Sequence, residues 1–328
     1  MFAHIIFWRK QTAERKLILM SYVSVKEIAQ IWGVTVQTVR RYCSEGKIPG
    51  AVQSMHGWQI PASANRPDRE EALPVRSIPQ LANRLQKQKK KKNYHGLYDY
   101  VQIYFTYCSS RMASNRLTMD QIDLIFRKGK VISRFEPVKV SDCIEAMNHN
   151  VCIDYIIDHV MDKLDAKFIK KLHYLLMFGS VDDRLEKVTP GEFRTESVTR
   201  PGRILPPSHT ITSSLRSIIL DYESIDEPEL SDILNFHVEF EMLMPFRDGN
   251  GRIGRLLMFK ECLRHGIMPF ILEDKNRSIY LEGIKKWSGR RKVLTEVVEK
   301  AQERFAREVK YHELHKHGKN FQPEGYQE

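Results

Sequence analysis

The chain has 328 residues, and its 42% hydrophobic and 28% charged residues are typical of an ordinary globular protein. This length indicates about two domains and at least one sizeable core. The formal net charge of +11 favours acidic partners, nucleic acid and nucleotide phosphates among them. No apolar run approaches the ~18–20 residues of a membrane span, so the sequence argues against a membrane-spanning helix.

The cysteines and the first residues indicate where the protein works. The five cysteines are odd in number and lack a C-x-x-C spacing, which predicts a reduced chain without a disulfide framework or zinc site. Residues 1–20 carry scattered charges that interrupt any secretory signal, and this leader receives no role. We therefore expect a cytoplasmic protein.

The first patterned unit covers residues 21–67. Ser24 and Glu27 have the spacing of a capping box, and apolar residues recur behind them at helical spacing. Gly33 is expected to end this helix, and Thr35 to cap a second one. Two short helices joined by a glycine-containing turn predict a helix-turn-helix. The unit resembles the N-terminal module of MerR- and excisionase-type DNA-binding domains, in which residues 46–61 would form a small wing.

The second of these helices supplies the candidates for DNA contact. Four polar side chains lie off its apolar stripe, where they can reach base edges or phosphates. DNA binding is the favoured interpretation, and a solvated face or a protein-contact module is the alternative. The four residues are Gln37, Thr38, Arg40 and Arg41.

Residues 68–95 are predicted to be a basic linker. Prolines interrupt the pattern, and Lys87 with Lys89–Lys92 forms a dense positive block. Like charges at this density repel one another and stay solvated. A tether that binds nucleic acid through these lysines is the alternative.

From residue 96 to 307 the chain reads as a run of helices with i, i+3, i+4 apolar spacing. One β element is expected, a hairpin around Pro201 and Gly202. The fold class is therefore mainly α, with a small hairpin and the helix-turn-helix in addition. Residues 308–328 are predicted to be a polar, frayed tail in which His312, His315 and His317 are solvated.

The segment 240–255 carries the strongest chemical signal. A tight glycine-rich loop stands at the start of a helix, where free backbone amides and the helix dipole favour phosphate. Arg252 and Arg255 lie three apart on one helix face and can clamp phosphate oxygens. Asp248 offers a hard oxygen ligand for the Mg²⁺ that accompanies a nucleotide triphosphate. The predicted phosphate-binding residues are Gly249, Asn250, Gly251, Arg252 and Arg255.

The stretch from Met244 to Arg255, MPFRDGNGRIGR, resembles the signature H-P-F-x-[D/E]-G-N-G-R-x-x-R of the Fic (Fido) family at every fixed position but one. The resemblance implies an all-α core that binds ATP·Mg²⁺ and transfers AMP to a Ser, Thr or Tyr hydroxyl, releasing pyrophosphate. Residues 191–194 resemble the segment that leads to the family's flap, a β-hairpin on which a protein target docks. The flap would contain Thr199, Arg200, Pro201, Gly202 and Arg203.

The exception is the catalytic histidine of the signature, which here is Met244. A positioned base is typically worth ~10²–10⁴ in rate, and a thioether cannot accept a proton at any useful pH. We therefore expect a nucleotide-binding protein whose transfer activity is lost or strongly weakened. His237 is expected to be structural or at the surface. The alternatives are a weak but active protein adenylyltransferase and a DNA-binding regulator that uses the core for partner contacts.

A second departure concerns the inhibitory helix that many relatives carry, [S/T]-x-x-x-E-[G/N], whose glutamate pairs with the last arginine of the signature. The equivalent residues here are Ser109, Ala113 and Ser114, so that an alanine replaces the glutamate. Arg255 is therefore expected to lack its intramolecular partner. The sequence names neither a target protein, a DNA site nor an oligomeric state.

Overall fold

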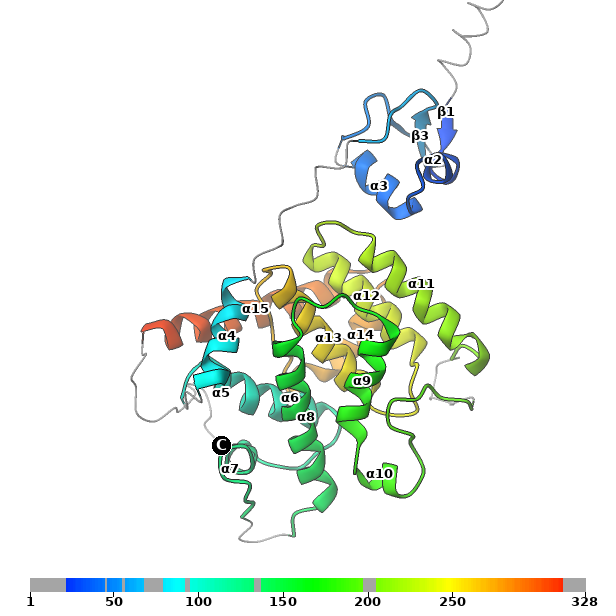
Figure 1. The fold of residues 1–328 in the computed structure, drawn as a ribbon. Coiled ribbons are helices and arrows are strands. Elements are labelled where there is room, and N and C mark those ends of the chain that lie inside the picture. Colours follow the sequence, from blue (N-terminus) through cyan, green and yellow to red (C-terminus); the bar gives the residue numbers. More distant parts are fainter. Residues whose placement is uncertain are drawn as a thin grey trace, which may run out of the picture. The chain divides into compact units, whose positions relative to one another are not determined.

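The computed structural model describes residues 22–44, 46–54, 57–67, 79–91, 95–132, 137–196 and 205–314. They form two compact units, one from the chain up to residue 76 and one from most of the chain after it (Figure 1). Helices dominate, and within these ranges the strands form a single three-stranded sheet in the first unit. The mainly α fold class predicted from the sequence is confirmed. None of the helices in the described ranges is both long enough and apolar enough to cross a membrane.

The first unit is a helix-turn-helix with a small sheet. In chain order it contains β1 (Tyr22–Ser24), α2 (Val25–Trp32), α3 (Val36–Ser44), β2 (Val52–Ser54) and β3 (Gly57–Pro61). The strands are antiparallel, and β3 lies between β1 and β2. The pairing of β2 with β3 agrees with the wing expected in this region.

Local hydrogen bonds explain why the two helices begin and end where they do. The Glu27 N–H donates to Ser24 Oγ (3.4 Å), and the Glu27 carboxylate accepts from the Ser24 N–H (2.8 Å). Gly33 ends α2 in the left-handed conformation (φ 64°), which glycine adopts without steric cost. Thr35 Oγ1 accepts from the Thr38 N–H at 3.1 Å at the start of α3. The predicted capping box, glycine stop and threonine cap are confirmed.

The second unit consists of helices joined by short connections. They are α4 (Gln80–Lys91), α5 (Leu97–Tyr100), the π-helical turn η1 (Val101–Phe105), α6 (Thr106–Met112), α7 (Met119–Lys128), α8 (Val140–Asp158), α9 (Ala166–Met177), α10 (Val181–Arg184), the 3₁₀ turn η2 (Ser208–Thr210), α11 (Ile211–Glu223), α12 (Leu230–Leu243), α13 (Asn250–Arg264), the 3₁₀ turn η3 (Asp274–Asn276), α14 (Arg277–Lys285) and α15 (Lys292–Leu314).

Helix α13 lies inside the second unit and packs against α12, α8, α9, α6 and α4 (Figure 1). It is buried along most of its length, polar residues included. Lys260 and Glu261 are fully buried, and Lys260 Nζ lies 2.7 Å from Glu261 Oε1. Each charge thus has the partner that a buried charge needs. Because helices pack against α13 on several sides, the direction of its N-terminus is fixed. The predicted phosphate loop lies at this N-terminus.

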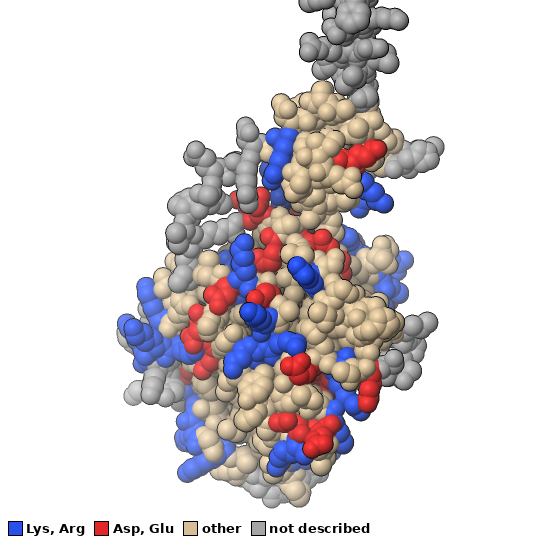
Figure 2. All heavy atoms as spheres, turned by 45° about the vertical axis from the view of Figure 1, so that its right-hand side comes forward, with Lys and Arg blue, Asp and Glu red and all other residues tan. Residues whose placement is uncertain are grey.

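The prediction of a solvated basic linker is wrong for residues 80–91, which form α4. Ala82 and Leu85 are buried in the main core, and Lys89 pairs with Asp158 at 2.6 Å. The lysine block concealed a short apolar stripe at helical spacing, which is sufficient to anchor one face of a helix. On the face drawn in Figure 2, basic and acidic side chains of the second unit are interspersed rather than separated.

The prediction of a frayed tail is wrong for residues 308–314, which continue α15. Val309 and His312 are buried, and the His312 ring lies 5.8 Å from the ring of Tyr100, so this histidine is not solvated. His315, His317 and the remaining tail lie outside the described residues, as do the leader 1–20 and the predicted flap residues Thr199, Arg200, Pro201, Gly202 and Arg203.

Candidate functional site

The connection between α12 and α13, residues 244–250, is here called the motif loop. Met244 ends α12 in the left-handed conformation (φ 46°, ψ 66°), and its N–H donates to the Phe240 carbonyl at 3.0 Å. Gly249 stands before α13 with φ 78°. Left-handed backbone is uncommon for a residue other than glycine. The geometry of the loop therefore depends on backbone conformation at both of its ends.

Asn250 closes the motif loop upon itself. The Phe246 N–H donates to Asn250 Oδ1 at 2.9 Å, and Asn250 Nδ2 donates to the Phe246 carbonyl at 2.8 Å. The side chain is buried, with 3% exposed. The side-chain amide of Asn250 is thus engaged by the loop, and phosphate binding by this residue, which stays a prediction, would fall to its backbone N–H.

His173 of α9 holds the same loop from outside, a role that was not predicted from the sequence. The Gly191 N–H donates to His173 Nδ1 at 2.9 Å, so the ring proton lies on Nε2, which donates to the Asp248 carbonyl at 3.2 Å. The ring stacks on Phe246 with centroids 3.8 Å apart. Burial lowers the pKa of His173 to about 4, so the ring is neutral at physiological pH. A histidine beside Leu172 in an apolar stripe was the only signal available.

Arg194 is the third group that holds the motif loop. Its Nε donates to the Met244 carbonyl at 2.9 Å, and its backbone N–H donates to the Pro245 carbonyl at 2.9 Å. Nη1 donates to the Glu196 carbonyl (3.2 Å) and Nη2 to the Pro206 carbonyl (2.6 Å). These two carbonyls stand on either side of the predicted flap. One buried guanidinium thus joins both ends of the flap segment to residue 244.

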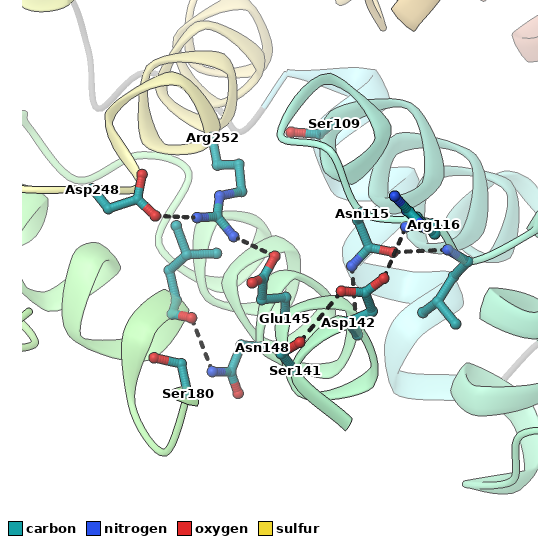
Figure 3. A network of polar contacts seen from close by, with 12 residues as sticks. Ser109, Asn115, Arg116, Ser141, Asp142, Glu145, Asn148, Ser180, Asp248 and Arg252 are labelled. Atoms are coloured by element: carbon teal, nitrogen blue, oxygen red, sulfur yellow. Dashed lines mark hydrogen bonds and ion pairs between the residues drawn. The ribbon is translucent and has the colours of Figure 1, made fainter. Parts of the chain in front are cut away.

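Arg252 lies in the first turn of α13 between two carboxylates (Figure 3). Its Nη1 is 2.9 Å from Glu145 Oε2 of α8, and its Nη2 is 3.3 Å from Asp248 Oδ2. The Arg252 side chain is only 5% exposed, against 24% for Glu145 and 46% for Asp248. Burial raises the pKa of the Glu145 carboxyl group, an effect that the charge of Arg252 opposes. Glu145 was not predicted, because nothing local marks a glutamate on another helix.

Arg255 lies one turn further along α13 and contacts Ser109 of α6. Its Nε donates to Ser109 Oγ at 3.1 Å, and its Nη2 donates to the Ser109 carbonyl at 2.9 Å. Arg255 thus lacks the glutamate partner of the inhibitory motif, but the expectation that it is free is wrong, since the serine of that motif bonds it. Ala113 ends α6, and Ser114 is left-handed (φ 73°), so neither brings a carboxylate to Arg255.

Together these residues make a site suited to an oxyanion. Gly249 caps α13 without a side chain, so the first-turn amides receive no acceptor from it, and the helix dipole points its positive end there. Arg252 and Arg255 add two guanidinium groups. Asp248 is the accessible carboxylate. In the described part of the chain no group of three or more His, Cys, Asp or Glu could hold a metal ion.

His237 and Tyr280 support the site from behind. Their Nε2 and hydroxyl oxygen are 2.7 Å apart, and His237 is fully buried. Burial lowers the pKa of His237 to about 3. A Cβ at Gly254 would come within 2.8 Å of the His237 ring, so only glycine allows α12 and α13 to approach this closely. His237 is structural, as expected.

The candidate DNA contacts of α3 are only partly accessible. Gln37 and Arg40 are exposed, whereas Thr38 is buried with its hydroxyl 2.8 Å from that of Thr35. The prediction of Thr38 as a base contact is therefore wrong. Arg41 is half-buried beside the Tyr42 ring.

Comparison with known families agrees with this architecture. Residues 163–262 match the Fic/DOC family, and residues 22–64 match a helix-turn-helix domain. The chain carries a Fic/DOC-family domain preceded by a helix-turn-helix domain.

Among curated proteins, the chain is similar to the protein adenylyltransferase Fic of Drosophila willistoni, with 26% identity over 185 residues, 55% of this chain and 35% of that protein. It is similar to the protein adenylyltransferase fic-1 of Caenorhabditis elegans, with 31% identity over 197 residues, again 55% and 35%. The chain thus spans about a third of the length of these curated relatives.

Two solved structures share the fold. One is a Fic domain containing signaling protein from Bacteroides thetaiotaomicron, with a TM-score of 0.58 and 19% identity, covering 74% of this chain and 99% of that one. The other is Fic-1 from Caenorhabditis elegans, with a TM-score of 0.55 and 18% identity, covering 71% of this chain and 72% of that one.

The histidines of the second unit lead to a prediction about pH. His173 and His237 have the lowered pKa values given above, and burial also lowers the pKa of His149 well below its ordinary value. The unfolded chain binds protons at these groups near pH 6.5, whereas the folded chain does not. The neutral histidines therefore contribute fully to the free energy of unfolding above that pH, and their contribution is lost as the pH falls below it. We expect the free energy of unfolding to decrease by roughly 0.7 kcal/mol per histidine between pH 7 and pH 6.

Urea unfolding at these two pH values measures the effect. His237→Gln should reduce the loss by the share of one histidine, and His209→Gln, at an exposed position, serves as the control. An unfolding free energy that does not change between the two pH values would contradict the prediction.

Proposed function

We propose that the second unit binds ATP with Mg²⁺ at the start of α13 and transfers AMP to protein hydroxyls weakly or not at all. One observation supports this most directly: Arg252 and Arg255 converge on a helix N-terminus beside Asp248, while Met244 stands at the position of the base. The named adenylyltransferases to which the chain is similar support the same chemistry.

Each charged group of the site has a part in binding. The first-turn amides of α13 and both guanidinium groups provide donors for phosphate oxygens. Asp248, with its carboxylate 46% exposed, would hold the Mg²⁺, whose chemical contribution is to neutralise phosphate charge. Asn250, His173 and Arg194 fix the motif loop, so the donors are arranged before a ligand arrives.

The missing element is a proton acceptor. Attack by a protein hydroxyl requires that its proton be removed, and the thioether of Met244 cannot take it. The three buried histidines with lowered pKa values are poor substitutes. Both ring nitrogens of His173 are engaged, His237 is bonded to Tyr280, and His149 is bonded to Thr106. Positioning and charge neutralisation remain, so weak transfer is the second form of the proposal.

A protein target would dock on the flap. Arg194 bonds the carbonyls on both sides of that segment and the carbonyl of Met244 at the same time. Glu196 and Pro206, which border the flap segment in the sequence, are thus tied to residue 244. We infer that the acceptor and the lost base were held by one common support.

Met244→His tests the proposal with α-labelled ATP and Mg²⁺, scoring label on the protein itself. Histidine is among the residues that tolerate left-handed backbone, so the variant should fold. We expect its labelling rate to exceed that of the wild type by about a hundredfold or more. Adding Asp248→Asn to the variant should remove the label if this site produces it.

The outcomes separate the two forms of the proposal. Equal labelling of wild type and Met244→His would mean that the wild type is an active enzyme without the histidine. A folded Met244→His protein that takes no label would contradict an otherwise intact site.

The first unit supports a second function, sequence-specific DNA binding. Gln37 and Arg40 are exposed on α3, the second helix of a helix-turn-helix. DNA sequences selected from a random pool should share a motif, and Arg40→Ala should weaken binding to it by about 1–3 kcal/mol. Lys26→Ala, on the exposed side of α2, is the control. Selection that recovers no motif and only salt-sensitive weak binding would argue against this function.

A further inference from the structure

The ion pair of Glu145 and Arg252 places an anion of the chain itself on an arginine of the phosphate site. Glu145 lies on α8, and its carboxylate approaches Arg252 Nη1 to 2.9 Å (Figure 3). The other terminal nitrogen of Arg252 faces Asp248. Both ends of the guanidinium are therefore occupied by carboxylates. A phosphate clamped by both terminal nitrogens of Arg252 would therefore compete with these two carboxylates for donors.

Contacts on both sides of Glu145 fix its backbone. One turn earlier, Asp142 accepts at Oδ2 from the Arg116 N–H (2.9 Å) and at its carbonyl from Asn115 Nδ2 (2.9 Å). One turn later, Asn148 Nδ2 donates to two carbonyls at the end of α9, at 2.9 and 2.8 Å. Figure 3 shows the contacts of Asp142 and one of the two contacts of Asn148. The Glu145 side chain is 24% exposed, so it can change its orientation without a shift of the helix.

Helix α8 is held in place by residues that directly follow the degenerate inhibitory motif. Asn115 and Arg116 directly follow the degenerate inhibitory motif, in which Ala113 stands where a glutamate was expected. Ser109 of that motif contacts Arg255 with a neutral hydroxyl and a carbonyl. Arg252 thus bonds the carboxylate of another helix, whereas Arg255 bonds the neutral Ser109, and the charge of Glu241 on α12 also acts on Arg255.

We propose that Glu145 is an internal competitor for nucleotide phosphate, which pairs with Arg252 in the resting protein and turns away when nucleotide binds. This rests on the proposed function of the same site. The carboxylate has access to solvent, so it can be released without burying an unpaired charge. The inhibitory carboxylate that Ala113 does not provide is thus supplied by Glu145 of another helix. It acts on Arg252 instead of Arg255.

Glu145→Gln is the test, with Mg²⁺ and α,β-methylene-ATP as the probe and calorimetry as the readout. The substitution keeps the size of the side chain and removes its charge. If the competitor keeps nine-tenths of the protein closed, the apparent Kd falls about tenfold in the variant. Asp182→Asn is the matched control, because the charge of Asp182 also acts on Glu145 without a contact to either arginine.

The outcomes distinguish this inference from the proposed function. Tighter binding by Glu145→Gln but not by Asp182→Asn supports the competitor. Equal affinities of variant and wild type, or an equal gain in the control, overturn it and leave nucleotide binding intact. Weaker binding by Glu145→Gln overturns it by making Glu145 a ligand, for instance of the cation. No binding by any of the three proteins overturns both.

Discussion

The candidate site depends on one constraint, the closure of the motif loop at the start of a buried helix. Asn250 bonds both backbone groups of Phe246, while His173 and Arg194 each fix a carbonyl of the loop. Helix α13 is packed against other helices on several sides, which restrains its position. The direction of its first-turn amides and of its two arginines follows from this arrangement.

This constraint explains how residue 244 can change without loss of the site. The interactions that place Met244 involve its backbone: its N–H bonds the Phe240 carbonyl, and its own carbonyl accepts from Arg194. None of these contacts requires an imidazole. A change of side chain at this position therefore removes a proton acceptor while the loop, the arginines and the support of the flap segment stay in place. In the proposed function, binding and chemistry are therefore carried by separable parts.

Prediction from sequence succeeded where the physical cause is local. The capping box of Ser24 and Glu27 and the loop before α13 depend on residues a few positions apart. It failed where partners are distant along the chain, as for Glu145 and Arg252, or where a strong composition hides a weak pattern. Helix α4 is the second case, because its lysines outnumber the few apolar residues that anchor it. No local rule connects a glutamate of one helix with an arginine of another.

The central claim is that the nucleotide site is intact and only the base is missing. The most direct measurement is the calorimetric affinity of the wild type and of Met244→His for α,β-methylene-ATP, with and without Mg²⁺. The account predicts Mg²⁺-dependent binding by both proteins with affinities within about threefold, since a base that acts only in the transition state adds nothing to ground-state binding. Binding by Met244→His alone, or by neither protein, would contradict it.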